Sequence, residues 1–457
     1  MAVTVNPQIF REYDVRGLVG QDLTDAAVEE LGKGYGTYMR SLGHRRAALG
    51  YDMRPSSEPF AQAIGRGMLS TGLDVVKVGC VPTPLLYYSL FHLNVNGGVM
   101  ITGSHNPPEF NGFKLAVGQA TIYGEDIQKI RRIIDQGQYA SGHGTLTETN
   151  VVPDYTADVE KRIGPFARRL KVVVDAGNGM GGPFGPGILR DLGAEVIELF
   201  TDLDGTFPNH HPDPTVPKNM EALVAQVLKE GADLGVAYDG DADRLGVVSD
   251  QGKIMWGDQL LILFSREVLT KHPGASIIFE VKCSQTLFDD IAQHGGRPLM
   301  WRTGHSLIKE KMKEEKSPLA GEMSGHFFFA DEYYGYDDAI YASCRVIRRV
   351  AQSGQKISAM LSDVPVVYST PETRVDCPDE EKFQVVEKLR EYFKQRYKVI
   401  DVDGVRVVFE DGWGLVRASN TQPVLVVRFE AKTPERLQAI QKLVLDKLAE
   451  VSSVNLS

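Results

Sequence analysis

Short apolar runs recur along most of the chain, and each is followed by a polar turn and a segment with helical spacing. One order of elements occurs three times: an opening strand with a turn, a second strand after a glycine, and a third strand that runs into a polar, glycine-containing loop. The opening strands are expected within residues 47–54, 172–178 and 276–284. Because short apolar strands alternate with helical segments, the pattern predicts three related α/β domains with mixed, mostly parallel sheets.

The C-terminal part of the chain has a different pattern. Closely spaced strands are predicted at residues 405–409, 414–417 and 424–431, and a helix follows at residues 434–451. This order predicts a fourth, α+β domain. The expected fold class is therefore α/β, with three related α/β domains and a C-terminal α+β domain, and the chemistry of their polar loops, described below, suggests that the four domains are arranged around one central cleft.

Two polar stretches are candidate domain boundaries. Residues 137–149 are rich in Gly, Ser and Thr, and residues 369–381 form a polar stretch close to two proline signals, which is typical of a linker. From these we expect domains at residues 1–150, 151–252, 253–363 and 364–457.

Composition excludes several classes of protein. Of the 457 residues, 42% are hydrophobic and 24% are charged, which is ordinary for a globular protein. No run reaches the roughly 18 apolar residues that a membrane span needs, and the start lacks a secretory pattern, so we expect a cytoplasmic protein without a membrane partner. The net charge of −10 argues against a nucleic-acid partner. The four cysteines contain no C-x-x-C pair, which favours reduced thiols over disulfides or zinc.

The first polar loop, residues 102–107 (TGSHNP), offers a hydroxyl beside an imidazole. Alone, the neighbouring Ser104 and His105 are compatible with an ordinary proline-stabilised turn as well as with a nucleophile. The loop is not the G-x-S-x-G elbow of a hydrolase, because Asn106 stands where the second glycine is needed.

The second loop holds Asp239, Asp241 and Asp243 at every second position. Carboxylates this close repel one another unless a cation neutralises them, and oxygen ligands favour Mg²⁺ or Ca²⁺ over zinc. An EF-hand does not fit, because Arg244 replaces its glycine and Asp250 its glutamate. A Mg²⁺ loop is the favoured interpretation, and a solvated acidic turn is the alternative.

Two further loops have compositions that suit a sugar phosphate. Glu322, Ser324 and His326 could exchange hydrogen bonds with sugar hydroxyls, although an ordinary polar turn has the same residues. The loop from Arg417 to Pro423 combines a guanidinium with hydroxyls and amides, as a phosphate cradle does, and a hairpin turn is its alternative.

These four loops, in this order, resemble the phosphohexomutase superfamily, and most closely its bacterial phosphomannomutase/phosphoglucomutase group. The resemblance covers essentially the whole chain, and its most specific strings are residues 10–17 (FREYDVRG), 102–108 (TGSHNPP), 207–214 (FPNHHPDP), 303–309 (TGHSLIK), 320–326 (AGEMSGH) and 412–420 (GWGLVRASN).

The resemblance implies a role for each loop. Ser104 would carry a phosphoryl group beside a Mg²⁺ ion held by Ser104 and the three aspartates, and Glu322 and Ser324 would bind sugar hydroxyls. The phosphate that does not react would be held by Arg417, Ser419, Asn420 and Thr421. Further catalytic residues would be Arg16, His105, Lys114 and His305, and Lys114 is favoured as the proton relay. The substrate would also be lined by Tyr13, Arg244, Lys282 and His326.

The implied reaction is a reversible shift of phosphate between O1 and O6 of glucose and mannose phosphates. Hexose 1,6-bisphosphate would be both intermediate and activator, and the chain would be a monomer or a weak homodimer. The alternatives are a Mg²⁺-dependent sugar-phosphate phosphatase and a non-enzymatic phosphosugar-binding protein. One departure from the family's pattern is Ala242, where the metal loop commonly has Gly; a positive φ there would strain an alanine.

Overall fold

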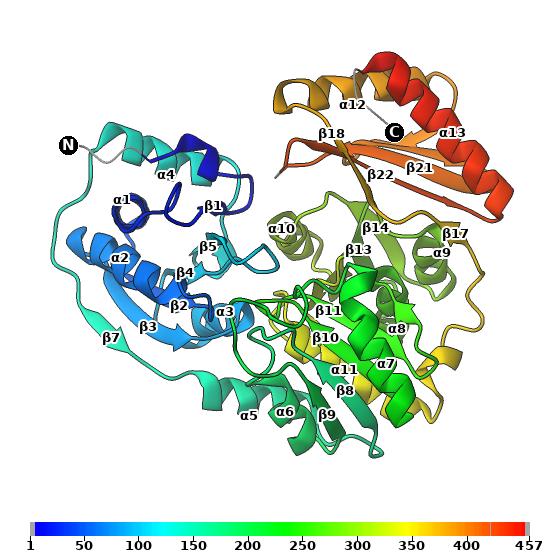
Figure 1. Ribbon diagram of the computed structural model, residues 1–457, viewed down its shortest axis with the longest axis horizontal. Helices are drawn as coiled ribbons and strands as arrows, with labels where there is room; N and C mark the ends of the chain where they lie inside the picture. Colours follow the sequence, from blue (N-terminus) through cyan, green and yellow to red (C-terminus); the bar gives the residue numbers. More distant parts are fainter. Residues whose placement is uncertain (1–4, 421, 453–457) are drawn as a thin grey trace. The chain divides into compact units, whose positions relative to one another are not determined.

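A computed structural model describes residues 5–420 and 422–452 (Figure 1). The chain divides into two compact units. The first unit consists of Met1–Phe264 together with Ser324–Met360, and the second consists of Ser265–Met323 together with Leu361–Ser457.

The first sheet of unit one has the strand order β1-β5-β4-β2-β3-β7, and β6 pairs with β5. The pairs β4–β2, β2–β3 and β3–β7 are parallel, whereas β5 runs antiparallel to β1, β4 and β6. The strands are β1 (Val15–Leu18), β2 (Arg46–Tyr51), β3 (Asp74–Cys80), β4 (Gly97–Ile101), β5 (Phe110–Val117), β6 (Ala120–Thr121) and β7 (Leu146–Glu148). The accompanying helices are η1 (Pro7–Ile9), α1 (Asp25–Ser41), α2 (Ser57–Ser70), α3 (Thr83–His92) and α4 (Glu125–Gln136).

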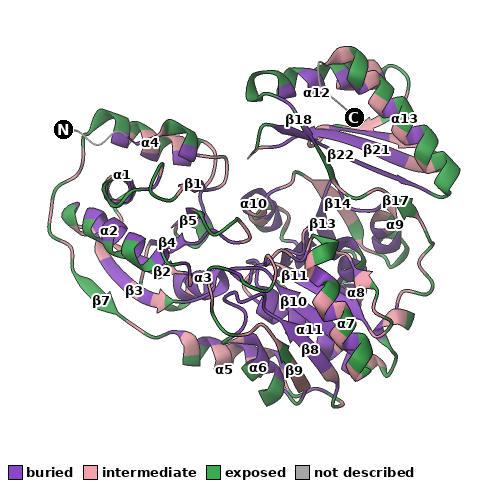
Figure 2. Ribbon diagram, in the orientation of Figure 1, coloured by how far each residue is buried: buried purple, intermediate pink, exposed green. Residues whose placement is uncertain are grey.

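The apolar faces of these helices form one core with the sheet. Helix α1 begins where the Thr24 hydroxyl accepts from the backbone N–H of Ala27, and its buried stripe packs against α2 and α4. Alternate residues of β2 and β4, such as Leu49 and Val99, complete the same core. Figure 2 shows the central strands buried and the outer faces of the helices exposed. The loops after β2 and β4 therefore begin at the carboxyl ends of two neighbouring parallel strands that are anchored in this core.

The second sheet, also in unit one, has the order β12-β11-β10-β8-β9. Strands β10, β8 and β9 are parallel, and β11 and β12 add antiparallel pairs at one edge. Its elements are α5 (Val152–Ile163), β8 (Lys171–Asp175), α6 (Gly185–Asp191), β9 (Glu195–Leu199), η2 (Pro217–Met220), α7 (Glu221–Glu230), β10 (Leu234–Tyr238), β11 (Leu245–Ser249) and β12 (Ile254–Met255). Unit one also contains β16 (Phe327–Phe329), α11 (Ala339–Ser353) and η3 (Ile357–Ala359), while α8 (Gly257–Lys271) continues into unit two.

Unit two contains a parallel arrangement and an antiparallel sheet. Strand β13 pairs in parallel with β14 and β15, and α9 and α10 accompany them. The last sheet has the order β17-β22-β21-β20-β19, with β18 also paired to β22, and all of its pairs are antiparallel. The bounds are β13 (Ser276–Glu280), α9 (Gln285–Gln293), β14 (Arg297–Trp301), α10 (His305–Glu315), β15 (Leu319–Gly321), β17 (Tyr368–Ser369), β18 (Thr373–Asp376), α12 (Asp379–Lys394), β19 (Lys398–Ile400), β20 (Val405–Phe409), β21 (Gly412–Ala418), β22 (Val424–Ala431) and α13 (Pro434–Val451).

Within unit two, a buried tryptophan joins the two sheets. Trp413 on β21 packs with Val281 after β13, and its indole N–H donates to Glu430 at 2.8 Å. The guanidinium of Arg406 lies 3.8 Å from the centre of the Trp413 ring and donates to the carbonyls of Val281 and Cys283. This contact fixes the C-terminal sheet against the loop that follows β13.

The predicted sheets are confirmed: three mixed, mostly parallel α/β sheets are followed by an antiparallel α+β part, and the arrangement around one central cleft stays a prediction. The prediction of a linker at residues 369–381 is wrong in part, because Thr373–Asp376 forms β18 and pairs with β22. The four domain boundaries stay a prediction. In the described residues, no helix has the length and apolar character needed to cross a membrane.

Candidate active site

Ser104 lies in the loop that follows β4, at the carboxyl end of a parallel strand. Its hydroxyl donates to Oδ2 of Asp239 at 2.8 Å, and Nδ1 of His105 lies 3.0 Å from Oγ of Ser104. The residue is buried, and its φ of 47° falls in the left-handed region, which non-glycine residues rarely adopt. Backbone strain of this kind, about 1–2 kcal/mol, persists only where surrounding contacts hold it, and it is concentrated at functional sites.

The aspartate loop follows β10 in the same unit. Asp239, Asp241 and Asp243 are fully buried, and each offers an oxygen within 4.8 Å of the others. The other oxygen of Asp239 accepts the backbone N–H groups of Asp243 and Arg244 at 3.0 and 3.1 Å, which closes the turn. Ala242 has a φ of 59°, so the strain expected for an alanine in this loop is present.

The charges on this loop interact strongly with one another. Burial, together with the charges of Asp243 and Asp241, raises the pKa of Asp239 well above its usual range. Burial would raise the pKa of Asp241 as well, but the charge and hydrogen bond of Lys114 and a hydrogen bond from Thr83 hold that pKa below its usual value. The loop is therefore an acidic site that a nearby cation must stabilise.

Lys114 on β5 supplies one such cation. Its ammonium group lies 2.8 Å from Oδ2 of Asp241 and also contacts Asp243. Burial alone would lower the pKa of Lys114, but the charges of the two aspartates outweigh burial and hold the pKa well above its usual range. The lysine is thus charged at neutral pH and offsets part of the negative charge of the loop.

The donor set fits a hard divalent cation. The three side chains offer only carboxylate oxygens, which Mg²⁺ prefers, and Oδ1 of Asp241 is buried without a hydrogen-bond partner among the described residues. One lysine cannot neutralise three carboxylates. The buried aspartates are therefore a candidate metal site.

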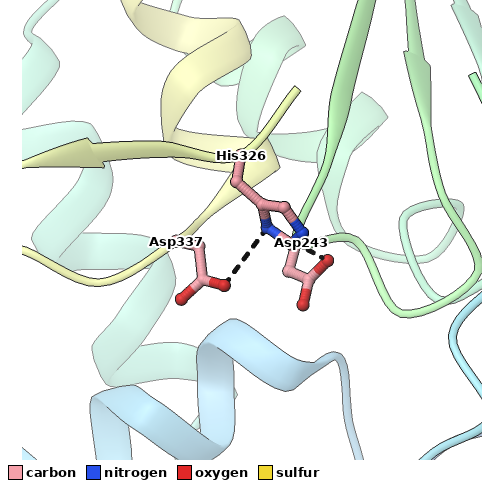
Figure 3. Close-up of side chains that lie close together, drawn as sticks. All are labelled: Asp243, His326 and Asp337. Carbon is pink, nitrogen blue, oxygen red and sulfur yellow. Dashed lines mark ion pairs between the residues drawn. The ribbon is translucent and has the colours of Figure 1, made fainter. Parts of the chain in front are cut away.

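A second group of candidate ligands surrounds His326. Asp337 and Asp243 both point toward the imidazole (Figure 3), with oxygens 3.2 and 3.6 Å from Nδ1. Nε2 of His326 accepts from Nε of Arg244 at 2.9 Å, so the proton of the neutral ring is on Nδ1. Because that proton occupies the nitrogen facing the carboxylates, we interpret the group as a support for Arg244 rather than as a metal site.

Further predicted residues lie around the serine loop. Arg16 on β1 donates to Asp14 at 2.5 Å and to the side chain of Asn106 at 3.2 Å, two residues beyond Ser104. Burial, with the positive charges of Arg244 and Arg16, lowers the pKa of His105 well below its usual range, so this histidine is neutral. Unit one therefore brings together most of the residues predicted as catalytic or metal-binding, namely Arg16, Ser104, His105, Lys114, Asp239, Asp241 and Asp243, and with them two residues predicted to line the substrate, Arg244 and His326.

Unit two contains most of the candidate sugar and phosphate groups. Oε1 of Glu322, after β15, accepts the backbone N–H of Gly304 at 2.8 Å. Asp403 accepts the backbone N–H of Thr303 and Nε of Arg417, both at 3.0 Å. The loop before α10, Glu322 and Arg417 thus belong to one hydrogen-bonded arrangement.

Lys282 lies in the same unit and pairs with two carboxylates. It lies 3.4 Å from Glu280 and 2.9 Å from Glu372. The charge of Lys282 lowers the pKa of Glu372 to about 2. Of the other predicted residues, His305 begins α10, Ser419 and Asn420 follow β21, Tyr13 and Ser324 are half-buried in unit one, and Thr421 lies outside the described residues.

Several residues that shape the site were not predicted. Arg54 and Asp52 follow β2 and contact the serine loop, Thr83 at the start of α3 donates to Asp241 at 2.5 Å, and Asp337 lies beside His326. The sequence held only a weak signal for Asp52 and Arg54: they follow the opening strand of the first repeat, but no local pattern shows that they contact the serine loop.

Four family models match the chain. All describe phosphoglucomutase/phosphomannomutase: alpha/beta/alpha domain I matches residues 7–141, domain II residues 153–252, domain III residues 256–368 and the C-terminal domain residues 372–447.

Full-length relatives agree with the family models. The chain is 44% identical over 453 residues to a phosphomannomutase/phosphoglucomutase of Pseudomonas aeruginosa, covering 99% of this chain and 98% of the relative. It is 43% identical to a phosphoglucomutase of Neisseria meningitidis, with 95% of each chain covered. A crystal structure of a phosphoglucomutase/phosphomannomutase family protein from Burkholderia thailandensis covers 98% of both chains, with a TM-score of 0.92 and 41% identity. The chain belongs to the phosphoglucomutase/phosphomannomutase family.

Proposed function

We propose that this protein is an enzyme that interconverts hexose 1-phosphates and hexose 6-phosphates through a phosphoserine at Ser104. The single observation that carries the proposal is the hydroxyl of Ser104, buried in a strained turn and 2.8 Å from the first of three clustered aspartates. Family membership over the full length supports the same activity.

In the forward half-reaction, phospho-Ser104 gives its phosphoryl group to the free hydroxyl of the sugar phosphate. The bond between phosphorus and Oγ of Ser104 breaks as a bond to the sugar oxygen forms. The sugar hydroxyl loses its proton and Oγ of Ser104 gains one, so the step neither consumes nor releases a proton overall. The resulting hexose 1,6-bisphosphate turns over, and its other phosphate returns to Ser104. The same serine thus serves both directions, and added hexose 1,6-bisphosphate would recharge a dephosphorylated enzyme.

The aspartate loop would hold Mg²⁺ through Asp239, Asp241 and Asp243. When bound, the ion would supply positive charge next to the phosphoryl oxygens, which favours transfer. Lys114 would remain in place as a second positive charge. The relay role predicted for Lys114 requires it to lose its proton, which the neighbouring carboxylates oppose, so we propose that its main contribution is electrostatic.

Recognition of the sugar would fall to other residues. Glu322 and Ser324 would bind O3 and O4, which exchange places roughly when the sugar turns over, and His305 would line the same region. The phosphate that is not transferred would bind Arg417, Ser419, Asn420 and Thr421. Tyr13, Arg16, Arg244, Lys282 and His326 would complete the lining.

The names of the relatives do not decide whether this chain acts on both glucose and mannose phosphates or on glucose phosphates alone. The Pseudomonas relative is named for mannose and glucose, and the Neisseria relative for glucose alone. We propose that this chain uses both, because O3 and O4 have the same configuration in the two sugars. We also propose a cytoplasmic location, which the four free cysteines support because they suit a reducing compartment. The oligomeric state, a monomer or weak homodimer, stays a prediction.

The test separates a mutase from a phosphatase. Purified protein with Mg²⁺ and a trace of glucose 1,6-bisphosphate is given glucose 1-phosphate or mannose 1-phosphate, and the 6-phosphates and inorganic phosphate are measured together. We expect conversion to the 6-phosphate without stoichiometric release of inorganic phosphate, and loss of conversion in Ser104→Ala. Continuous release of phosphate would establish the phosphatase, and binding without turnover would establish a non-enzymatic protein.

A further inference from the structure

One guanidinium holds most of the serine loop. Arg54, which follows β2, is fully buried, and its two terminal nitrogens donate to backbone carbonyls of this loop. Nη2 reaches the carbonyl of Ser104 at 2.9 Å and that of Asn106 at 2.5 Å, and Nη1 reaches those of Pro107 at 2.7 Å and Phe110 at 2.9 Å. A single side chain therefore fixes four carbonyls between Ser104 and Phe110.

Asp52 holds the same guanidinium from the other side. Its Oδ2 lies 3.4 Å from Nε of Arg54 and accepts the backbone N–H of Gly103 at 3.1 Å. Its Oδ1 accepts the backbone N–H of Arg54 at 3.0 Å and the hydroxyl of Ser57 at 2.5 Å. A Cβ at residue 103 would overlap the guanidinium carbon, so only glycine allows this approach. Asp52 and Arg54 together form hydrogen bonds with the backbone on both sides of Ser104.

The second domain covers this pair. The ring of Phe207 lies with its centre 5.1 Å from the guanidinium carbon of Arg54, and the backbone of Gly205 packs against the Cα of Arg54. Phe207 begins the string at residues 207–214, in which His211 contacts the carbonyl of His105. The sequence alone indicates no role for this string, and its contacts with Arg54 and the serine loop now indicate one in holding the loop.

The contacts of Arg54 explain how a strained serine is kept in place. Ser104 has a positive φ, and its backbone N–H donates to the hydroxyl of Thr102 at 2.8 Å. Its carbonyl, bound by Arg54, lies against the backbone of Gly240 in the aspartate loop, where a Cβ would overlap it. Arg54 therefore acts on the carbonyl of the residue whose hydroxyl faces Asp239.

We propose that Arg54, held by Asp52 and covered by Phe207, is a positioning residue that fixes the backbone of Ser104 and so sets the rate at which this serine accepts and gives a phosphoryl group. This inference rests on the proposed function. Arg54 donates hydrogen bonds to backbone carbonyls of the loop and to neither the hydroxyl of Ser104 nor the carboxylates of Asp239, Asp241 and Asp243. Its charge also interacts with Asp241, and Arg54→Lys keeps that charge while it removes the directed hydrogen bonds. Lysine keeps the charge but has no planar fork, and cannot reproduce the four directed hydrogen bonds.

The main test compares Arg54→Lys with a matched control, Arg345→Lys. Arg345 is also fully buried in unit one, and pairs in a bidentate manner with Asp331 at 2.9 Å through both terminal nitrogens. For each protein, the rate at which glucose 1,6-bisphosphate phosphorylates Ser104 is followed by rapid quenching and intact mass, and normalised to the folded fraction. The KM for glucose 1-phosphate is measured in parallel.

We expect Arg54→Lys to slow phosphorylation of Ser104 and kcat by about thirtyfold or more, with KM changed by less than about threefold, because a small misplacement of reacting groups costs this much. Arg345→Lys should stay within about twofold of wild type per folded molecule. An unchanged rate in Arg54→Lys, or an equal loss in Arg345→Lys, would overturn the positioning role.

A second variant decides the matter if Arg54→Lys does not fold. Phe207→Leu keeps an apolar cover but removes the ring from the guanidinium, and should slow phosphorylation of Ser104 by several-fold without a matching rise in KM. A wild-type rate in a folded Phe207→Leu would contradict the proposal. If the wild-type protein itself accepts no phosphoryl group from the bisphosphate, the proposed function is wrong, and the proposed role of Arg54 is wrong with it. If wild type is phosphorylated and Arg54→Lys is phosphorylated at the same rate, only the positioning role is wrong.

Discussion

Replacing Lys114 by methionine should make the protein's stability depend on a divalent cation. The substitution keeps an unbranched side chain that is one atom shorter and removes the ammonium group that contacts Asp241 and Asp243. At 2.8 Å and an effective dielectric constant near 20, one such contact has a gross attraction of about 6 kcal/mol. Part of this is offset by the desolvation of the lysine. Breaking a buried pair and leaving its partner charged costs about 3–5 kcal/mol, and we expect a loss of this size in EDTA.

Mg²⁺ should recover much of this loss. An ion that binds only the folded protein stabilises it by about 2.7 kcal/mol at one hundred times its dissociation constant. Without Lys114 the aspartate loop carries more negative charge, so the ion should raise the Tm of Lys114→Met by more than it raises that of wild type. The assay is a thermal melt of both proteins in EDTA and across a Mg²⁺ titration.

Lys282→Met is the matched control. Lys282 is equally buried and lies 2.9 Å from Glu372, but it has no cluster of three carboxylates around it. It should lose stability in EDTA, and Mg²⁺ should not restore that loss. An unchanged Tm for Lys114→Met in EDTA, or an equal Mg²⁺ effect on both lysine variants, would refute the reasoning that Lys114 and the ion neutralise the same carboxylates.

Three further predictions concern other parts of the chain. Burial raises the pKa of Asp338 to about 6, so this group favours the folded state most at low pH, and about 3 kcal/mol of stability is lost as the pH rises from about 4 to 6. In denaturant titrations over this range, wild type should lose that amount relative to Asp338→Asn. Parallel pH profiles of the two proteins would contradict the prediction. Ala242→Gly should change the free energy of unfolding by less than about 1 kcal/mol. The substitution relieves about 1–2 kcal/mol of backbone strain, but the greater entropy of the unfolded chain and the loss of a buried methyl group offset this gain. A loss of stability above about 3 kcal/mol would show that the alanine is not strained. Wild type should use glucose 1-phosphate and mannose 1-phosphate with kcat/KM values within about tenfold of each other, and galactose 1-phosphate far less well. Glu322→Ala should reduce kcat/KM for glucose 1-phosphate and mannose 1-phosphate by the same factor. A much larger preference between glucose and mannose would refute recognition through O3 and O4.

The strands and helices that sequence patterns predicted well are those with strong local signals. Residues 424–431 form one buried strand, and α13 begins at Pro434, where the hydroxyl of Thr433 accepts from the N–H of Arg436. Strand β18 escaped prediction because only Val375 among its residues is buried. Its strand character comes from pairing with β22, which a local pattern does not contain.

The candidate site divides in the same way. The aspartate loop could be predicted because its ligands are adjacent in sequence and their mutual repulsion is a local property. Arg54 could not, because its hydrogen bond to the carbonyl of Ser104 spans 50 residues. Within a polar turn after a strand, nothing local distinguishes a guanidinium that binds a distant loop from one that faces solvent. The contact between Ser104 and Asp239 spans 135 residues, and only the family resemblance predicted it.

The most direct test of the account is to follow one phosphoryl group through the protein. Protein charged with glucose 1,6-bisphosphate that carries a labelled phosphate should be labelled on Ser104 alone, as peptide mapping can establish, and Ser104→Ala should take up no label. A chase with unlabelled glucose 1-phosphate should move the label into the bisphosphate and then into glucose 6-phosphate. Label on another residue, or label released as inorganic phosphate without reaching the sugar, would contradict the claim that Ser104 carries the phosphoryl group between the two positions of the hexose.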